Sequence, residues 1–150
     1  LVIKNEYFAV AFPNNGGGYE IRNPYFKGCI APKDISIIQK SERLRGRCCC
    51  LFEGFMDYLS YLTLVKSGRI TEDGEHMDYI VLNSVSNVSR AIEPIKKYKV
   101  IHCYLDNDDA GRRVVDSLHE LLGDKVQDMF APYPLYKDLN DFLRNKKKIP

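Results

Sequence analysis

Short apolar runs alternate with helix-like segments after residue 47, and this alternation constrains the fold more than any other feature of the sequence. The runs are residues 48–52, 77–82, 100–105 and 125–130. The first of these runs, residues 48–52, is continuously apolar, which is typical of a strand buried on both faces. The segments between them, residues 55–66, 87–97 and 109–122, have the apolar spacing of helices. The alternation predicts an α/β fold in which helices flank a mostly parallel sheet of about four strands.

The first 46 residues follow a different pattern, which predicts a small antiparallel β segment. Residues 6–12 are rich in β-forming side chains, and residues 14–18 (NNGGG) are a strong turn signal. Residues 19–22 and 25–30 can form two further strands, and residues 35–46 are an ambiguous loop that can hold a short strand. We therefore expect two units: an N-terminal β-rich segment, residues 1–46, and an α/β core, residues 47–150.

The cysteines do not form the pattern of a disulfide framework or of a zinc site. Their number is odd, three of them are adjacent, and no C-x-x-C pair occurs among Cys29, Cys48, Cys49, Cys50 and Cys103. We expect free thiols in a reducing cytoplasm. No stretch approaches the ~20 apolar residues of a membrane span, so no membrane association is expected. The chain begins at Leu1 rather than Met, and we expect it to be a piece of a longer protein.

Basic residues are concentrated at the front of the chain. Residues 1–50 hold eight Lys and Arg against four Asp and Glu, whereas residues 51–150 hold fourteen against sixteen. This asymmetry suggests an anionic partner at the front and a carboxylate site in the core, although charges scattered over a solvated surface would give the same counts.

Carboxylates follow two of the predicted core strands. Glu53 comes directly after the first strand and Asp106 directly after the third, with Asp108 and Asp109 in the same loop. In open α/β sheets, ligands bind beyond the carboxyl ends of the strands. Asp106 and Asp108 alternate along the chain and can point at one spot, and two oxygen ligands are what Mg²⁺ typically takes from a protein. Asp109 is expected to cap the following helix.

Two other interpretations of this loop fit less well. An EF-hand loop needs an oxygen ligand at its fifth position and Glu at its twelfth, but Ala110 and Ser117 stand there. A phosphatase-type Asp-x-Asp nucleophile usually follows the first strand of its fold, whereas Asp106 follows the third.

Two more acidic clusters have ordinary explanations when each is taken alone. In Glu53-Gly54-Phe55-Met56-Asp57, the acids suit the start of a helix. In Lys137-Asp138-Leu139-Asn140-Asp141, Asp138 suits the N-cap of a last short helix at about residues 139–145.

Taken in order, however, the three clusters resemble the motifs of the Toprim domain. This domain is shared by bacterial replicative primases, topoisomerases, OLD-type and RNase M-five-type nucleases and RecR-type recombination proteins. The resemblance covers about residues 47–143 and is strongest to the primase-like proteins of mobile genetic elements. There, Glu-Gly-Phe-x-Asp and Leu-Asp-Asn-Asp-x-Ala-Gly occur nearly as they stand at residues 53–57 and 105–111. The segment around residues 17–28 also resembles the one that precedes the Toprim core in those proteins.

The resemblance implies roles for the matching residues. Asp106 and Asp108 would hold Mg²⁺ or Mn²⁺, and Asp57 and Asp138 would belong to the same metal-binding acidic cluster. Glu53 would position the metal or act as general acid or base in nucleotidyl transfer. The third motif departs from the Asp-x-Asp form of many primases, since Asn140 takes the place of the second acid and Asp141 follows it.

The resemblance also implies a function and partners. We expect the catalytic fragment of a DNA primase-like protein, which makes primers from nucleoside triphosphates on a single-stranded DNA template. Six basic side chains are candidates for contact with template and nucleotide: Arg112 and Arg113 just past the acidic loop, Lys137 in the third cluster, and Arg22, Lys27 and Lys33 in the front segment. Arg112 is the strongest of them because it lies beside the acidic loop. The aromatic residues at the front could stack on bases, but we expect them in the core of the small sheet. We further expect this chain to be monomeric. We expect contact with a helicase to be made through regions outside this chain.

Two alternatives use the same fold. A Toprim nuclease would hydrolyse phosphodiesters with the same carboxylates, and a non-catalytic module would only bind nucleic acid. The cysteine set of the zinc-binding domain found upstream in such primases is lacking in this chain, so the fragment alone can be inactive.

Overall fold

A five-stranded mixed sheet forms the centre of the molecule. The computed structural model describes residues 8–39, 47–71 and 77–148. The strand order is β4-β6-β5-β7-β8, with bounds Ser36–Ile38 (β4), Cys48–Phe52 (β5), Asp78–Val81 (β6), Val100–Tyr104 (β7) and Val126–Asp128 (β8). Strands β5 to β8 run parallel, and β4 pairs antiparallel with β6. The predicted, mostly parallel sheet is confirmed, and β4 adds one strand at its edge.

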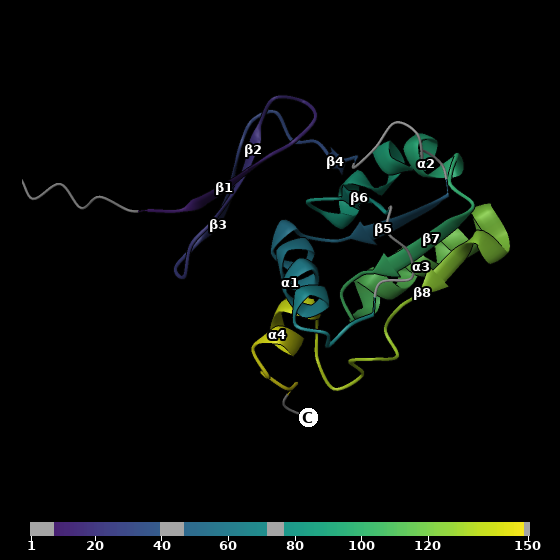
Figure 1. Cartoon of the computed structure of the whole chain (residues 1–150). Coiled ribbons are helices and arrows are strands. Elements are labelled where there is room, and N and C mark those ends of the chain that lie inside the picture. The colour runs from purple at the N-terminus through teal and green to yellow at the C-terminus, as the bar shows by residue number, and fades with distance from the viewer. Residues whose placement is uncertain (1–7, 40–46, 72–76, 149–150) are drawn as a thin grey trace, which may run out of the picture.

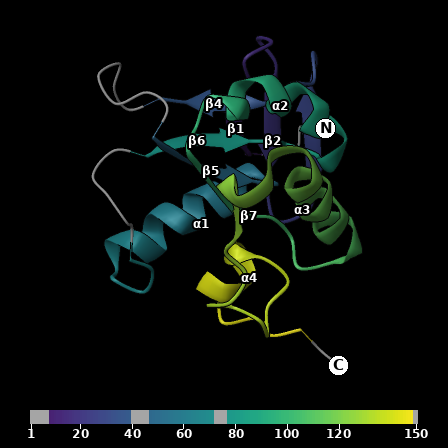
Figure 2. The same ribbon diagram turned by 90° about the vertical axis from the view of Figure 1, so that its right-hand side faces the viewer.

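Helices cover both faces of this sheet (Figures 1 and 2). Helices α1 (Phe55–Lys66) and α4 (Leu139–Leu143) lie on one face, and α2 (Val88–Lys96) and α3 (Asp109–Leu122) on the other. Successive residues of β5 alternate between the two layers: Cys49 and Leu51 join the core under α2 and α3, whereas Cys50 and Phe52 join the core under α1. Burial on both faces explains why β5 is continuously apolar.

A separate three-stranded antiparallel sheet stands beside the core (Figure 1). Its strands are β1 (Val10–Pro13), β2 (Tyr19–Arg22) and β3 (Lys27–Ile30). This confirms the predicted antiparallel segment, although Glu6 and Tyr7 of the first predicted strand lie outside the described residues. The Phe12 ring stacks on Phe55 of α1 with centroids 5.2 Å apart, and Ser36 Oγ donates to the Pro13 carbonyl at 2.8 Å. These contacts attach the small sheet to the core.

Four aromatic side chains of the front segment are exposed rather than in a core, contrary to expectation, and Tyr7 lies outside the described residues. Phe8 and Tyr25 are 86% exposed, and Tyr19 and Phe26 are also exposed. The expectation fails because a three-stranded sheet has two faces, and the core covers only the part around Phe12.

Among the described ranges, no helix is long and apolar enough to cross a membrane.

Candidate functional site

The acidic residues meet at the point where the chain diverges to the two faces of the sheet. Neighbouring strands β5 and β7 lead into α1 on one face and α3 on the other. Such a switch point leaves a crevice beyond the carboxyl ends of the strands. Glu53 follows β5 and Asp106 follows β7, and the Asp106 backbone N–H donates to Glu53 Oε2 at 3.4 Å. The carboxyl ends of β5 and β7 therefore bring together acids that are 53 residues apart.

Asp106 and Asp108 converge on one cation, the ammonium group of Lys137. Lys137 Nζ lies 2.9 Å from Asp106 Oδ2 and 3.5 Å from Asp108 Oδ2. The hydrogen bond from Lys137 to Asp106 and the nearby negative charges raise the Lys137 pKa, so the side chain is charged at neutral pH. Two carboxylates and one ammonium thus form the centre of the site.

Asp108, rather than Asp109, caps α3. Asp108 Oδ1 accepts hydrogen bonds from the backbone N–H groups of Ala110 and Gly111, both at 3.1 Å, whereas Asp109 is exposed in the first turn. Burial favours the neutral form of Asp108, but the Gly111 N–H and the Lys137 charge outweigh it, and the Asp108 pKa is lowered. The expected cap at Asp109 is wrong by one residue because Asp108 has the extended backbone that an N-cap requires.

Gly111 lets α3 begin close to the loop. A Cβ at this position would lie 2.0 Å from the Asp106 carbonyl oxygen, so only glycine fits. The first turn of α3 therefore packs directly on the backbone of Asp106, which fixes the separation of the two carboxylates.

Glu53 and Asp57 are acids in a partly dry environment. Burial, followed by the charge of Asp106, raises the Glu53 pKa to about 7. Asp57 is buried in the first turn of α1, where burial and the charge of Asp138 raise its pKa well above the usual value. The backbone N–H of Asn140 donates to Asp57 Oδ1 at 3.2 Å and links this acid to α4. Glu53 therefore titrates near neutral pH in the absence of a metal.

Asp138 begins α4 as its N-cap. Its Oδ1 accepts the backbone N–H of Asp141 at 2.7 Å. Burial and the charge of Asp106 outweigh this bond and raise the Asp138 pKa. Asn140, at the position of the second acid in the Asp-x-Asp form, donates its Nδ2 to Ser60 Oγ of α1 at 3.0 Å. In this chain that position ties two helices together instead of adding a carboxylate.

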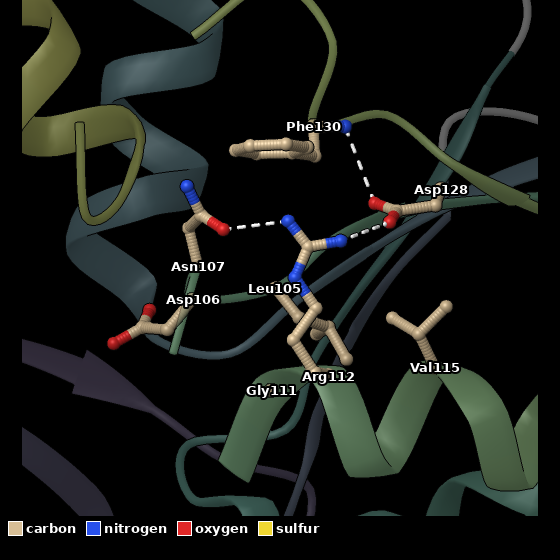
Figure 3. Close-up of a pocket in the computed structure, with 8 residues that line it drawn as sticks. All are labelled: Leu105, Asp106, Asn107, Gly111, Arg112, Val115, Asp128 and Phe130. Carbon is tan, nitrogen blue, oxygen red and sulfur yellow. Dashed lines mark hydrogen bonds and ion pairs between the residues drawn. The ribbon is translucent and has the colours of Figure 1, made fainter. Parts of the chain in front are cut away.

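Arg112 has partners within the protein (Figure 3). Its guanidinium donates to Asp128 Oδ2 at 2.8 Å and to Asn107 Oδ1 at 2.6 Å, and it lies 4.1 Å from the centre of the Phe130 ring. The Asp106 carboxylate points away from it (Figure 3). Arg112 thus holds the acidic loop to the end of β8, and its contact with nucleic acid stays a prediction.

The three basic residues predicted in the front segment lie outside the acidic cluster. Arg22 and Lys27 face each other across β2 and β3, and both are exposed. Lys33 is exposed in the connection to β4, where its carbonyl accepts a hydrogen bond from Arg90 at 2.9 Å. In Figure 1 the arrowheads of β5 and β7 point toward the side on which the small sheet lies. The small sheet, whose strands β2 and β3 carry Arg22 and Lys27, therefore lies on the side of the core where β5 and β7 end (Figure 1).

The ion pairs of Lys137 with Asp106 and Asp108 could not be predicted from the local sequence pattern. The backbone N–H of Asn107 donates to the Lys137 carbonyl at 2.6 Å, and Asn107 Nδ2 donates to the Tyr136 carbonyl at 3.1 Å. These bonds join loops that are about 30 residues apart. The sequence indicated Lys137 only as a member of the third cluster and as a candidate for contact with template or nucleotide, and that contact stays a prediction.

The residues present fit a hard divalent cation with few protein ligands. No group of three or more His, Cys, Asp or Glu side chains within the described ranges is arranged to hold a metal by itself. Mg²⁺, however, is commonly bound through one or two carboxylates, with water and substrate phosphates completing its shell. Asp106 and Asp108 already direct one oxygen each at a single cation.

Comparison with known families gives two matches along the chain. The profile of the Toprim-like family matches residues 50–143, and that of a domain of unknown function matches residues 2–31. No protein with a curated description matches the chain.

Two solved structures share the fold. The primase fragment of the bacteriophage T7 primase-helicase protein is 18% identical, with a TM-score of 0.59 over 92% of this chain and 58% of that chain. The second contains T7 primase domains bound to an RNA/DNA hybrid and dTTP, in a complex with the T7 lagging-strand DNA polymerase. It is 14% identical, with a TM-score of 0.58 over 91% of this chain and 70% of that chain. The present chain thus spans less than two thirds of the first of these structures.

Proposed function

Because the chain belongs to the Toprim-like family, we propose that it is the catalytic module of a DNA primase-like protein. Its reaction would be metal-dependent nucleotidyl transfer from nucleoside triphosphates on a single-stranded DNA template. The observation that carries this proposal is the convergence of Asp106 and Asp108 on one cation at the switch point of the sheet. The similarity in fold to the T7 primase fragment supports it.

The aspartates would hold the metal ion, and Glu53 would act as the general base for the attacking hydroxyl. Asp106 and Asp108 would bind Mg²⁺ or Mn²⁺, and Asp57 and Asp138 would complete the acidic cluster around the ion. A divalent ion there offsets the charge that builds on the attacked phosphate and on the leaving pyrophosphate. Glu53, whose pKa is about 7 without metal, can accept the proton of the attacking hydroxyl near neutral pH.

The small sheet would bind the template. Its exposed surface combines the basic side chains of Arg22 and Lys27 with the exposed rings of Tyr25 and Phe26. Basic groups that follow a backbone and aromatic rings that stack on bases are the usual means of holding single strands. Lys33 would extend the basic surface toward the core. We accordingly assign template binding to residues 1–46 and chemistry to residues 47–150, with β4 of the first unit paired into the sheet of the second.

The further partners are part of the same proposal. A helicase would contact regions outside this chain, and we expect the module itself to be monomeric, which sedimentation equilibrium can measure.

Product analysis with the full-length protein tests the proposal. The protein is incubated with labelled single-stranded DNA, nucleoside triphosphates and Mg²⁺, and the variants Asp106→Asn and Asp108→Asn are compared with Asp116→Asn, an exposed acid on α3. We expect new short primers from the wild type and from Asp116→Asn, and at least a 100-fold loss in the two site variants. Shortened template without primers would instead identify a nuclease. DNA binding without either product, unchanged in the site variants and without Mg²⁺, would identify a non-catalytic module.

A further inference from the structure

Lys137 lies where the proposed function places a divalent ion. We propose that Lys137 is a built-in counter-cation that competes with the divalent ion for Asp106 and Asp108, so that metal binds only when the ammonium group leaves. This inference rests on the proposed function, because it concerns the same two carboxylates.

Both cations require the same oxygens. Asp108 Oδ1 accepts two backbone hydrogen bonds at the start of α3, so Oδ2 is the oxygen left for a cation. That oxygen is 3.5 Å from Lys137 Nζ, and Asp106 Oδ2 is 2.9 Å from it. A divalent ion held by these two carboxylates would lie too close to the ammonium group for both cations to remain.

The backbone of Lys137 is fixed while its side chain can move. The Lys137 carbonyl accepts the Asn107 N–H at 2.6 Å, and the next residue caps α4. The side chain, in contrast, is 47% exposed and ends in a flexible four-carbon stem. The ammonium group can therefore turn into solvent without displacement of either loop.

In the metal-free protein, the Lys137 ammonium group offsets the repulsion among the surrounding carboxylates. Glu53, Asp106, Asp108 and Asp138 all lie close enough to influence one another's ionisation or that of Lys137. Like charges at such separations repel, and an opposite charge among them relieves the repulsion. Lys137 thus keeps the metal-free loop in the geometry that the metal needs, and it lowers the affinity for the metal.

Binding of Mn²⁺ alone, measured by the EPR signal of the free ion, tests this inference. Lys137→Met removes the charge and keeps the length of the side chain. Lys125→Met is the matched control, because Lys125 Nζ donates to the Lys96 carbonyl and forms no ion pair with a carboxylate within the described part of the chain. We expect Lys137→Met to bind Mn²⁺ roughly tenfold more tightly than the wild type, and Lys125→Met to bind it as the wild type does. Equal or weaker binding by Lys137→Met overturns the inference.

Thermal unfolding provides a second readout. Without metal, Lys137→Met should melt below the wild type, and saturating Mn²⁺ should raise its melting temperature more than that of the wild type. If Lys137→Met does not fold, Lys137→Arg replaces it, and its larger forked cation should bind the carboxylates more firmly and weaken Mn²⁺ binding. Unchanged Mn²⁺ affinity in Lys137→Arg would then overturn the inference.

The double variant Asp106→Asn/Asp108→Asn separates this inference from the proposed function. Loss of Mn²⁺ binding in the double variant, with no gain in Lys137→Met, leaves the proposed metal site intact and rejects the role of Lys137. Retention of full Mn²⁺ binding in the double variant rejects the proposed metal site itself.

Discussion

Glu53 is the residue whose chemistry depends most on its surroundings. It ends an apolar strand, accepts the Asp106 N–H and is partly buried beside two other carboxylates. Burial and the charge of Asp106 raise its pKa from 4.5 to about 7. In the folded, metal-free protein it therefore binds a proton more tightly than in the unfolded chain, and this difference couples its titration to stability.

The sign of the coupling gives a prediction for Glu53→Gln. In the wild type, the stabilisation from protonated Glu53 is complete below pH 4.5 and is lost as the pH rises to about 7. Glutamine cannot lose a proton, so the stability of Glu53→Gln relative to the wild type should increase between these pH values and then stay constant. Urea unfolding in EDTA from pH 4 to 8 measures this difference in stability. Glu120→Gln is the control, because Glu120 is exposed. A parallel pH dependence in Glu53→Gln and the wild type would contradict the raised pKa.

Helix α3 shows which elements local sequence determines. Its predicted bounds, residues 109–122, are confirmed, because apolar side chains at helical spacing and a glycine at the end specify them locally. Strand β4 could be recognised only as a possibility, because three residues become a strand through pairing with β6. The ion pairs of Lys137 could not be predicted, since they depend on hydrogen bonds between the loops at Asn107 and Lys137.

The close packing at the start of α3 makes stability sensitive to a side chain at position 111. Gly111→Ala should lower the free energy of unfolding by about 3 kcal/mol, because the new methyl group would meet the Asp106 carbonyl oxygen at 2.0 Å and force the loop and helix apart. Gly28→Ala is the control: its methyl group would contact only the Phe26 ring, at 3.6 Å, and stability should change by less than about 1 kcal/mol. Urea unfolding of both variants checks this. Similar stabilities for the two would show that α3 does not pack so closely on the loop.

In the whole molecule, the basic and aromatic surface of the small sheet lies on the side of the core where the acidic residues cluster. The small sheet is held to α1 by Phe12 and lies on the side toward which β5 and β7 point (Figure 1). The sequence indicated both parts separately, through charge asymmetry and motif order. It did not indicate that Tyr19, Tyr25 and Phe26 are exposed, because β-forming side chains look alike in a covered and an uncovered sheet.

This arrangement predicts that template binding and metal binding can be separated. Arg22→Ala/Lys27→Ala should weaken binding of single-stranded DNA and reduce the salt dependence, the slope of log K against log salt, by about 1. Its Mn²⁺ affinity should be that of the wild type. Lys96→Ala/Lys125→Ala, a pair that the Lys125–Lys96 hydrogen bond places together, is the charge-matched control. An unchanged salt slope in the Arg22/Lys27 variant would exclude the small sheet as the template surface.

The metal site itself is tested most directly by the broadening of backbone amide NMR signals on addition of substoichiometric Mn²⁺. A bound paramagnetic ion broadens the signals of nearby amides. We expect the signals of Glu53, Asp106, Asp108 and Asp138 to broaden first. This selective broadening should disappear in Asp106→Asn/Asp108→Asn, while Asp116→Asn should behave as the wild type. Broadening that is centred elsewhere, or that persists unchanged in the double variant, would contradict a divalent-metal site at this edge of the sheet.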